Sequence, residues 1–346
     1  MKEFWLGKPY YSLDAFFKNT YGEKYYKIAL NGGFSCPNRD GTLSTGGCIF
    51  CSAGGSGDFA TPADASSIEA QLLAGQNLLK GKNTGRRFIA YFQAYTNTYG
   101  PVSYLRDVYT AALSLPDVSG ISIATRPDCL GREVLTLLAE LKALYPDKFI
   151  WVELGLQTIH EKTTLFLNSG FTLADFEQAM TNLYLLDIPV IVHLILGLPG
   201  ETPAQMYETC AYLNRIPTAD ALSVSGSDAA HSHLLPHTLR PFGVKLQLLH
   251  ILKHTPLGDM YLSGNLTGFS ALSLEEYTDI VIHCLEILSP DITVHRLTGD
   301  GPKDLLIAPL WSLNKRNVLN TLHKTMLKRG TYQGRCFYDA GSTHSV

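Results

Sequence analysis

Three cysteines in a short glycine-rich segment are the residues of this chain best suited to chemistry. Eleven residues separate Cys36 from Cys48, and two separate Cys48 from Cys51. Four-iron clusters are held by cysteine thiolates, usually four of them. Three thiolates would leave one iron open to an outside ligand, and the neighbouring glycines let the backbone wrap closely around such a group. We therefore interpret the segment as the site of a [4Fe-4S] cluster.

A zinc site is the alternative interpretation of the same cysteines, because Cys-x-x-Cys is common at zinc. Tetrahedral zinc requires a fourth protein ligand, and the sequence offers none nearby. The other four cysteines are scattered along the chain, so the set of seven does not describe a disulfide framework. The iron–sulfur interpretation is favoured over zinc.

The elements that must position these cysteines follow an alternating pattern. Runs typical of β-strands occur at 26–31, 87–93, 120–125, 150–156, 190–196 and 243–251. Helical patterns lie between them, including 131–144, 172–187 and 202–215. This alternation predicts an α/β fold with a parallel sheet, either a barrel or a doubly wound open sheet.

The two faces of the predicted strands differ in polarity, and this difference separates the candidate folds. Side chains alternate between faces, so Val152, Leu154 and Leu156 share an apolar face, whereas Glu153 and Gln157 share a polar one. Lys27, Ser122, Lys245 and Gln247 have the same polar parity in their strands. Closed eight-stranded barrels and doubly wound sheets are apolar on both faces. The pattern therefore predicts a partial (βα)6 TIM-like barrel with a ligand inside.

The chain after about residue 265 breaks the alternation. We expect a core with an N-terminal extension over 1–265, and a small C-terminal α+β subdomain over 266–346 that contains TVHRL (293–297). The segment 219–241 fits neither neighbour and is interpreted as an insertion on the barrel face away from the cysteines. Its His231, His233 and His237 have a spacing that could hold a metal, but a flexible loop is the favoured interpretation.

Composition excludes several classes of protein. The N-terminus has no apolar signal region, and no apolar run is long enough to cross a bilayer, so we expect a cytoplasmic protein without membrane contact. A net charge of −3 argues against a surface that binds nucleic acid everywhere. Near the C-terminus, however, cations outnumber acids, which describes either a solvated helix face or a phosphate-binding patch: Lys315, Arg316, Lys324, Lys328, Arg329 and Arg335.

Several longer motifs together resemble one known family. They are GFSCPNRDGT…GGCIFCS, YFQAYTNTYGP (91–101), ATRPDCL (124–130), VELGLQT (152–158), HLILGLPGET (193–202), RLTGDGP (296–302) and PLWSLNK (309–315). Almost from end to end the chain resembles the radical S-adenosylmethionine (SAM) superfamily, in particular an uncharacterised family related to the Elongator catalytic subunit without its acetyltransferase domain. The resemblance implies a [4Fe-4S] cluster that reductively cleaves SAM to a 5′-deoxyadenosyl radical.

The resemblance also implies roles for individual residues. Gln93, Thr96 and Asn97 would bind the methionine amine, Arg126 its carboxylate, Glu153 and Gln157 the ribose or substrate, and Gly197 to Gly200 the adenine. Cys129 and Glu153 are the candidate catalytic residues, although a buried apolar role for Cys129 is the alternative. The chain departs from the family pattern at Asn168–Phe171, Gln247 and His254, which affects the details of the substrate site.

Three functions remain open at this point. The Elongator relationship implies a tRNA-modifying enzyme acting on wobble uridine, and the C-terminal basic run would contact the tRNA. A radical enzyme acting on a small metabolite or a protein side chain is the second, favoured by the net charge. The third is a non-catalytic iron–sulfur or zinc protein. As an enzyme, the protein would also need an electron donor such as flavodoxin or ferredoxin.

Overall fold

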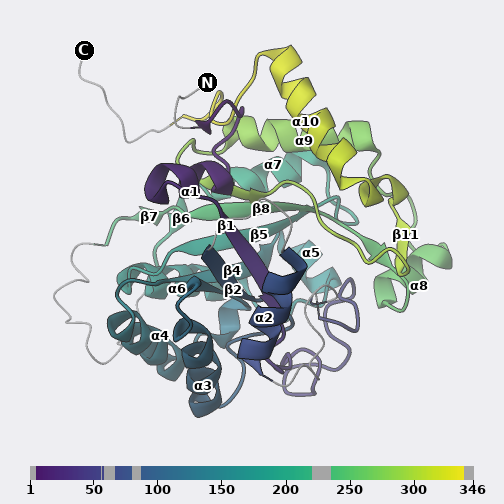
Figure 1. Cartoon of the computed structure of the whole chain (residues 1–346). Coiled ribbons are helices and arrows are strands. Elements are labelled where there is room, and N and C mark those ends of the chain that lie inside the picture. Colours follow the sequence, from purple (N-terminus) through teal and green to yellow (C-terminus); the bar gives the residue numbers. More distant parts are fainter. Residues whose placement is uncertain (1–4, 56, 58–66, 80–86, 220–234, 339–346) are drawn as a thin grey trace.

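The computed structural model describes residues 5–55, 57, 67–79, 87–219 and 235–338 (Figure 1). Its centre is a sheet of seven parallel strands in the order β1-β2-β3-β4-β5-β8-β10. The strands are β1 (Tyr25–Leu30), β2 (Arg87–Phe92), β3 (Val118–Thr125), β4 (Phe149–Gln157), β5 (Val190–Leu196), β8 (Gly243–Leu248) and β10 (Thr293–Arg296). The sheet curls into half a barrel, which confirms the predicted partial TIM-like barrel.

Strand β10 is the seventh strand of the sheet, whereas the sequence pattern predicts six. Thr293 and Val294 pair in parallel with Gly243 and Val244 of β8. Parallel neighbours need a crossover connection, usually a helix. Here α9 (Leu274–Ile287) lies between the two strands in the sequence. Residues 293–296, which lie in the region expected to form the C-terminal subdomain, therefore contribute to the barrel sheet itself.

The hydrophobic core lies between the outer face of the sheet and the helices that cover it (Figure 1). Side chains of one parity, such as Ile28, Phe92, Ile123, Leu154 and Val192, are all buried in this core. The covering helices are α2 (Ile68–Leu79), α3 (Val102–Leu113), α4 (Arg132–Leu144), α6 (Leu173–Leu185), α7 (Pro203–Tyr212) and α9. Helix α10 (Lys315–Arg329) packs on α9. The polar strand face thus points into the half-barrel.

Helix α1 (Leu13–Tyr21) closes the amino end of the barrel interior. Its Phe17 packs with Ile89, Trp151 and Ile191, which share the inward parity of their strands. The Phe17 ring stacks on Tyr25 with centroids 4.3 Å apart. Because aromatic side chains fill this end, the inward polar residues gather at the carboxyl end of the strands.

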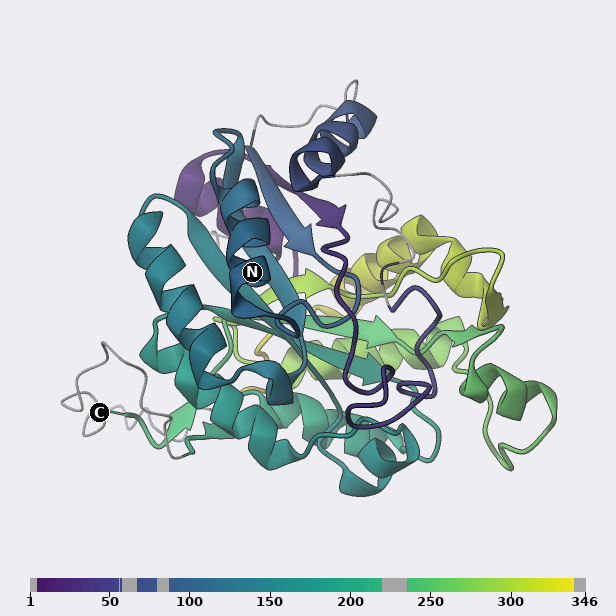
Figure 2. The same ribbon diagram turned by 90° about the horizontal axis from the view of Figure 1, so that it is seen from below.

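The carboxyl end carries the cysteine loop, α5 (Glu161–Phe166) and α8 (Pro256–Leu262), and Figure 2 shows α8 extending from the body beside that loop. The backbone amide of Leu257 donates to the Ile49 carbonyl at 2.9 Å, which fastens α8 to the cysteine loop. Strands β9 (Ile251–Leu252) and β11 (Leu306–Ala308) pair near α8 and tie the C-terminal region to the same end.

The described flanks of the predicted insertion lie at the opposite end of the strands. Residues 216–217 (β6) and 238–239 (β7) form a short antiparallel pair between α7 and the start of β8. His237 lies beside β7, where its carbonyl accepts from Thr218. His231 and His233 fall outside the described residues. Within the described part, no helix is both long and apolar enough to span a membrane.

Candidate active site

The cysteine loop joins β1 to α2 and brings Cys36, Cys48 and Cys51 to the wall of one cavity. The loop is held by backbone turns, such as the Cys51 amide donating to the Cys48 carbonyl at 2.9 Å. Gly47 has a φ of 81°, and a side chain there would lie 2.8 Å from Nε of Arg39. Asn168 anchors the loop from outside by donating to the Gly47 carbonyl at 2.9 Å.

Two guanidinium groups lie beside the three thiols. Arg39 donates to the carbonyls of Cys51 and Ser52 at 2.8 and 2.5 Å. Burial raises the pKa of Cys48 to about 12, the neighbouring Cys51 adds to this, and Arg126 opposes it. Thiolates at this site therefore need positive charge around them, which iron and the two arginines would supply. The donor set fits a thiolate-bound iron–sulfur cluster.

The cysteines do not converge on one point. Among the described residues, no group of three or more His, Cys, Asp or Glu side chains is arranged to hold a single metal ion. A four-iron cluster makes no such demand, because each thiolate binds its own iron atom.

Most of the proposed cofactor ligands line the same cavity. Gln93, Thr96, Arg126, Glu153 and Gln157 do so together with the cysteines. Asn97, Cys129, Gly197 and Gly200 are not in its lining. Their roles toward SAM or substrate stay predictions, but the structure shows how several of them are held.

Arg126 is fixed at the cavity rim by an acidic neighbour. Its Nε and Nη2 donate to the two carboxylate oxygens of Asp128 at 2.9 and 2.8 Å, and its Nη1 donates to the Ser169 carbonyl at 2.8 Å. The Phe171 ring lies 5.3 Å from the guanidinium carbon. Such pairing restricts the side chain to one orientation, toward the cysteines.

Gln157 and Asn97 each bury an amide oxygen without a hydrogen-bond donor. Gln157 ends β4 in a left-handed conformation, with a φ of 67°, beside a register shift in the β4–β5 pairing. Buried acceptors are normally paired, and exceptions require an explanation. A bound ligand carrying an ammonium or hydroxyl group would satisfy Gln157, so this strand end fits the SAM that the family motifs imply.

The remaining predicted residues lie just outside the cavity. Asn97 is fully buried and joins two strand ends by donating to the Ala124 carbonyl at 2.8 Å. Burial raises the pKa of the Cys129 thiol to about 12, with Asp128 adding to the effect. Gly197 has a φ of 86°, and a side chain there would lie 2.9 Å from Leu272. Gly200 has a φ of 85° with open space around it.

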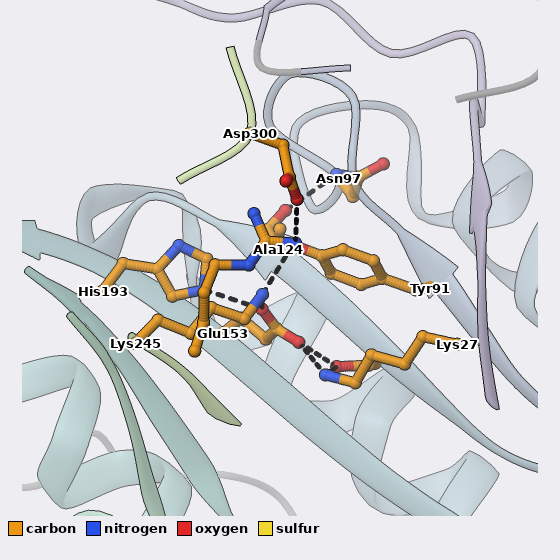
Figure 3. Close-up of polar contacts among 10 residues, drawn as sticks. Lys27, Tyr91, Asn97, Ala124, Glu153, His193, Lys245 and Asp300 are labelled. Carbon is orange, nitrogen blue, oxygen red and sulfur yellow. Dashed lines mark hydrogen bonds and ion pairs between the residues drawn. The ribbon is translucent and has the colours of Figure 1, made fainter. Parts of the chain in front are cut away.

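Glu153 lies at the centre of a polar network inside the barrel (Figure 3). Its side chain is fully buried and accepts from four groups. Lys27 and Ser122 donate to Oε1 at 2.5 and 2.6 Å. His193 donates to Oε2 at 2.7 Å, and Lys245 also contacts Oε2. The carboxylate is therefore fully engaged by the protein itself.

The pKa values in this network move in a consistent way. Burial alone would raise the pKa of Glu153, but Lys245, Lys27 and His193 hold it well below its usual range. Burial lowers the pKa of Lys245 to about 7, Glu153 opposes the shift, and Lys27 and Arg296 add to it. Burial likewise lowers the pKa of His193 to about 4. One carboxylate faces several cations, so the carboxylate stays ionised while a cation is destabilised.

Five further residues line one or both of two adjoining cavities without having been predicted as site residues: Lys27, Tyr91, His193, Lys245 and Arg296. A signal was present. Lys27 and Lys245 have inward parity in their strands, and Tyr91 lies two residues before Gln93 on the same face of β2. Arg296 opens the RLTGDGP motif.

Comparison with known proteins places these features in context. A family model described as the radical SAM superfamily matches residues 39–213, and one described as the radical SAM C-terminal domain matches residues 241–328. The uncharacterized protein YtqA of Bacillus subtilis is 42% identical over 330 residues, covering 95% of this chain and 93% of the relative. Protein YhcC of Escherichia coli is 36% identical over 310 residues, covering 90% of both.

Among solved structures, the archaeal Methanocaldococcus infernus Elp3 with an N-terminal deletion is similar, with a TM-score of 0.62 and 15% identity. The match covers 89% of this chain and 64% of the archaeal chain. At this level of identity the likeness concerns the fold.

Proposed function

Since this chain belongs to the radical SAM superfamily and is therefore an enzyme, we propose that it modifies a tRNA nucleoside, the wobble uridine. The family uses a [4Fe-4S] cluster and SAM, and Cys36, Cys48 and Cys51 are the residues that would hold the cluster. When bound, the cluster supplies the electron that cleaves SAM and starts radical chemistry. A donor such as flavodoxin or ferredoxin would deliver that electron.

The protein's own residues enclose the cavity in which this chemistry would occur and hold the side chains around it in fixed orientations. The aromatic side chains around α1 close the amino end of the barrel against water. Arg126 is held in one orientation by Asp128 and Ser169. Gln157 offers an unpaired acceptor at the end of β4. These groups bind and orient, and they leave the carboxyl end of the strands open to a substrate.

The position of α10 favours RNA as the substrate, because the helix begins at an opening of the barrel cavity. Lys315, its first residue, lines a side opening of the barrel cavity. Arg316, Lys324 and Lys328 follow on the same helix as exposed cations. An α-helix turns by about 100° and rises by about 1.5 Å per residue, so Arg316, Lys324 and Lys328 lie within about a third of the helix circumference and span about 18 Å. A helix that begins at a cavity mouth and carries a row of exposed cations further along suits a phosphate backbone whose base enters that cavity.

Two of the six cations in the basic run are partly neutralised. Lys315 contacts Asp300 at 2.7 Å, and Arg329 contacts Asp279 at 2.5 Å. Both pairs are exposed enough to be weak, so a polyanion would compete for these cations. Arg335 is exposed beyond the end of α10.

The test is salt-dependent tRNA binding by the protein with its cluster. Replacing Lys324, Lys328 and Arg329 by glutamate should abolish binding, because each phosphate contact releases counterions. The modified nucleoside should then disappear from the tRNA of cells that carry only this variant. The matched control replaces Lys24, Arg87 and Arg215, which are exposed near the amino ends of the strands, and should bind tRNA like the parent.

Normal tRNA binding and modification by the α10 variant would reduce the basic run to a solvated helix face and contradict the proposal. A parent protein without salt-dependent tRNA affinity would contradict it as well. In that case a small metabolite or a protein side chain becomes the favoured substrate. Release of 5′-deoxyadenosine from SAM without tRNA should be the same in parent and variant, because α10 lies outside the cluster loop.

A further inference from the structure

A second cavity adjoins the cysteine-lined one, on the side of the half-barrel that faces the C-terminal region. Tyr91, Gln93, Lys245, Arg296 and Asp300 belong to the walls of both cavities. The second cavity, which we call the side opening, continues past Lys27, Lys303 and Lys315. A molecule that enters by the side opening thus meets Lys245 and Arg296 before it reaches the cysteines.

The walls of the side opening carry an unequal set of charges. Five cationic side chains belong to its described lining: Lys27, Lys245, Arg296, Lys303 and Lys315. Asp300 is the acidic residue in that described lining, and Glu153 contacts two of the five lysine and arginine side chains from behind. The described residues therefore place five cations against two carboxylates.

Neither carboxylate can neutralise this excess. Glu153 already accepts from Lys27, Ser122, His193 and Lys245. Asp300 contacts Lys315 at 2.7 Å and lies 3.6 Å from Arg296, so one acid serves two cations there as well. Burying like charges together is costly unless a counter-charge joins them.

Lys245 is the most buried of these cations, and its lowered pKa shows that its charged form is destabilised. Lys245 is 4% exposed, and its Nζ donates to the Tyr91 hydroxyl at 3.0 Å besides contacting Glu153. The charged and titratable groups that face it are Glu153 from β4, His193 from β5, Lys27 from β1, Tyr91 from β2, and His295 and Arg296 from β10. Burial, Lys27 and Arg296 together lower its pKa to about 7.

We infer that the side opening is a subsite for an anionic group of the substrate, a carboxylate or a phosphate, bound between Lys245, Lys27 and Arg296. A bound anion would supply negative charge that the described side chains around this site do not provide. The subsite lies on the path to the cysteines, so an anion held in it would orient the rest of the substrate toward the cluster. The inference rests on the proposed enzymatic function, but it does not require that the substrate be tRNA.

The pH dependence of binding follows from Lys245. An anion stabilises the protonated amine, so the pKa of Lys245 must rise when the anion binds. For an anion whose own charge does not change in this range, affinity should be nearly constant well below pH 7, where the amine is mostly protonated. Above pH 7 binding must take up a proton, so affinity should fall by up to about tenfold per pH unit.

The experiment measures the thermal midpoint of the cluster-loaded protein against increasing phosphate or malonate, with chloride keeping ionic strength constant. A ligand that binds the folded state raises the midpoint in a saturable manner. Arg296→Gln and Lys245→Met should each lower the affinity for the anion by about tenfold or more, because each removes a cation from the subsite. The rise in the thermal midpoint should then need a correspondingly higher anion concentration. Lys24→Gln removes an exposed cation before β1, outside both cavities, and should respond like the parent.

Each result decides the matter. A parent response that is lost in Arg296→Gln and weakens above pH 7 supports the subsite, and a preference for malonate or phosphate identifies the anion. Equal responses in the parent, Arg296→Gln and Lys24→Gln, or a malonate response that does not change above pH 7, would overturn it. Arg296 is half-buried and has no contact with Glu153 among the described contacts, so its variant keeps the test valid if Lys245→Met does not fold.

The outcome is separable from that of the tRNA proposal. The glutamate variant at Lys324, Lys328 and Arg329 should lose tRNA and keep its affinity for the anion. A parent that binds the anion but not tRNA would retain the subsite and point to a small anionic substrate. A parent that binds tRNA through α10 but shows no anion response would retain the RNA proposal alone.

Discussion

Individual side chains in the cavity divide into those that hold a cofactor and those that hold the barrel. The three cysteines lie together on the wall of the cavity, whereas Glu153 has four protein partners and both of its oxygens are engaged. Since Glu153 is saturated, its contribution is to keep Lys27, Lys245 and His193 in place around the cavity. Gln157, with an unpaired acceptor, is better placed to contact a ligand.

Replacing any one of Cys36, Cys48 and Cys51 by alanine should remove the cluster. Each thiolate binds a separate iron, and two remaining thiolates cannot retain a four-iron unit against dilution. The parent, reconstituted without oxygen, should contain about four irons per chain, whereas the variants should contain nearly none. Cys336→Ala, at an exposed position outside the cavity, is the matched control. Stoichiometric zinc in the parent, with no visible absorption, would contradict the assignment.

Glu153→Gln should destabilise the fold strongly. The change leaves Lys27 and Lys245 facing each other in the interior without a counter-charge. Breaking a buried ion pair in this way costs about 3–5 kcal/mol of unfolding free energy. Urea unfolding would measure it, with Glu140→Gln as control, because that exposed partner of Arg106 should contribute no more than about 1 kcal/mol. A loss in Glu153→Gln as small as that of the control would show that the network does not stabilise the barrel.

Among the elements, α9 and β10 bind the C-terminal region to the barrel. Tyr277, Ile280, Val281 and Leu285 of α9 are buried in the same core as the strands. Strand β10 extends the sheet beyond β8, and its Val294 amide donates to the Tyr11 carbonyl at 2.7 Å, which ties in the N-terminal segment. Gln333 also accepts from the Tyr11 amide at 2.9 Å. Tyr11 thus links the segment before α1 both to β10 and to the segment after α10.

A chain that ends at residue 265 should therefore not fold cooperatively. Removing α9 and β10 takes buried apolar side chains out of the core that they share with the strands, and leaves β8 without its neighbour in the sheet. Thermal unfolding followed by near-ultraviolet circular dichroism should show no sharp transition. As a control, deleting residues 220–234 should preserve the transition, because β6 and β7 already join the described flanks. A sharp transition in the shortened chain would instead support two independent domains.

At the scale of the whole molecule, charge is distributed so that the cavity and the surface act together. The chain carries a net charge of −3, yet cations concentrate along the side opening and continue onto α10 from Lys315. Such a local concentration of positive charge attracts an anion to one region, while the rest of the surface does not bind anions non-specifically. The tRNA and anion experiments examine two parts of one positive region, its outer helix and its inner end.

Much of this architecture could be read from the sequence, because local patterns encode it. The strands 87–93, 120–125, 150–156 and 190–196 agree with β2 to β5 to within about two residues at each end. The alternation of apolar and polar side chains predicted the half-barrel and its polar interior, and the family motifs predicted the cluster and SAM. The seventh strand could not be predicted in this way. Four residues of β10 carry too weak a pattern to show that they pair with β8.

The sequence by itself determined the kind of enzyme and the cofactors that its family uses, since the type and spacing of residues in the family motifs are properties of the chain. Only the tertiary structure decided what the other inward side chains do. Lys27, Glu153, His193 and Lys245 come from four separate strands, and nothing in their spacing shows that one carboxylate serves three partners. Their interaction depends on strand order, register and the low polarity of the interior. Those properties exist only once the sheet has curled and α1 has closed its amino end.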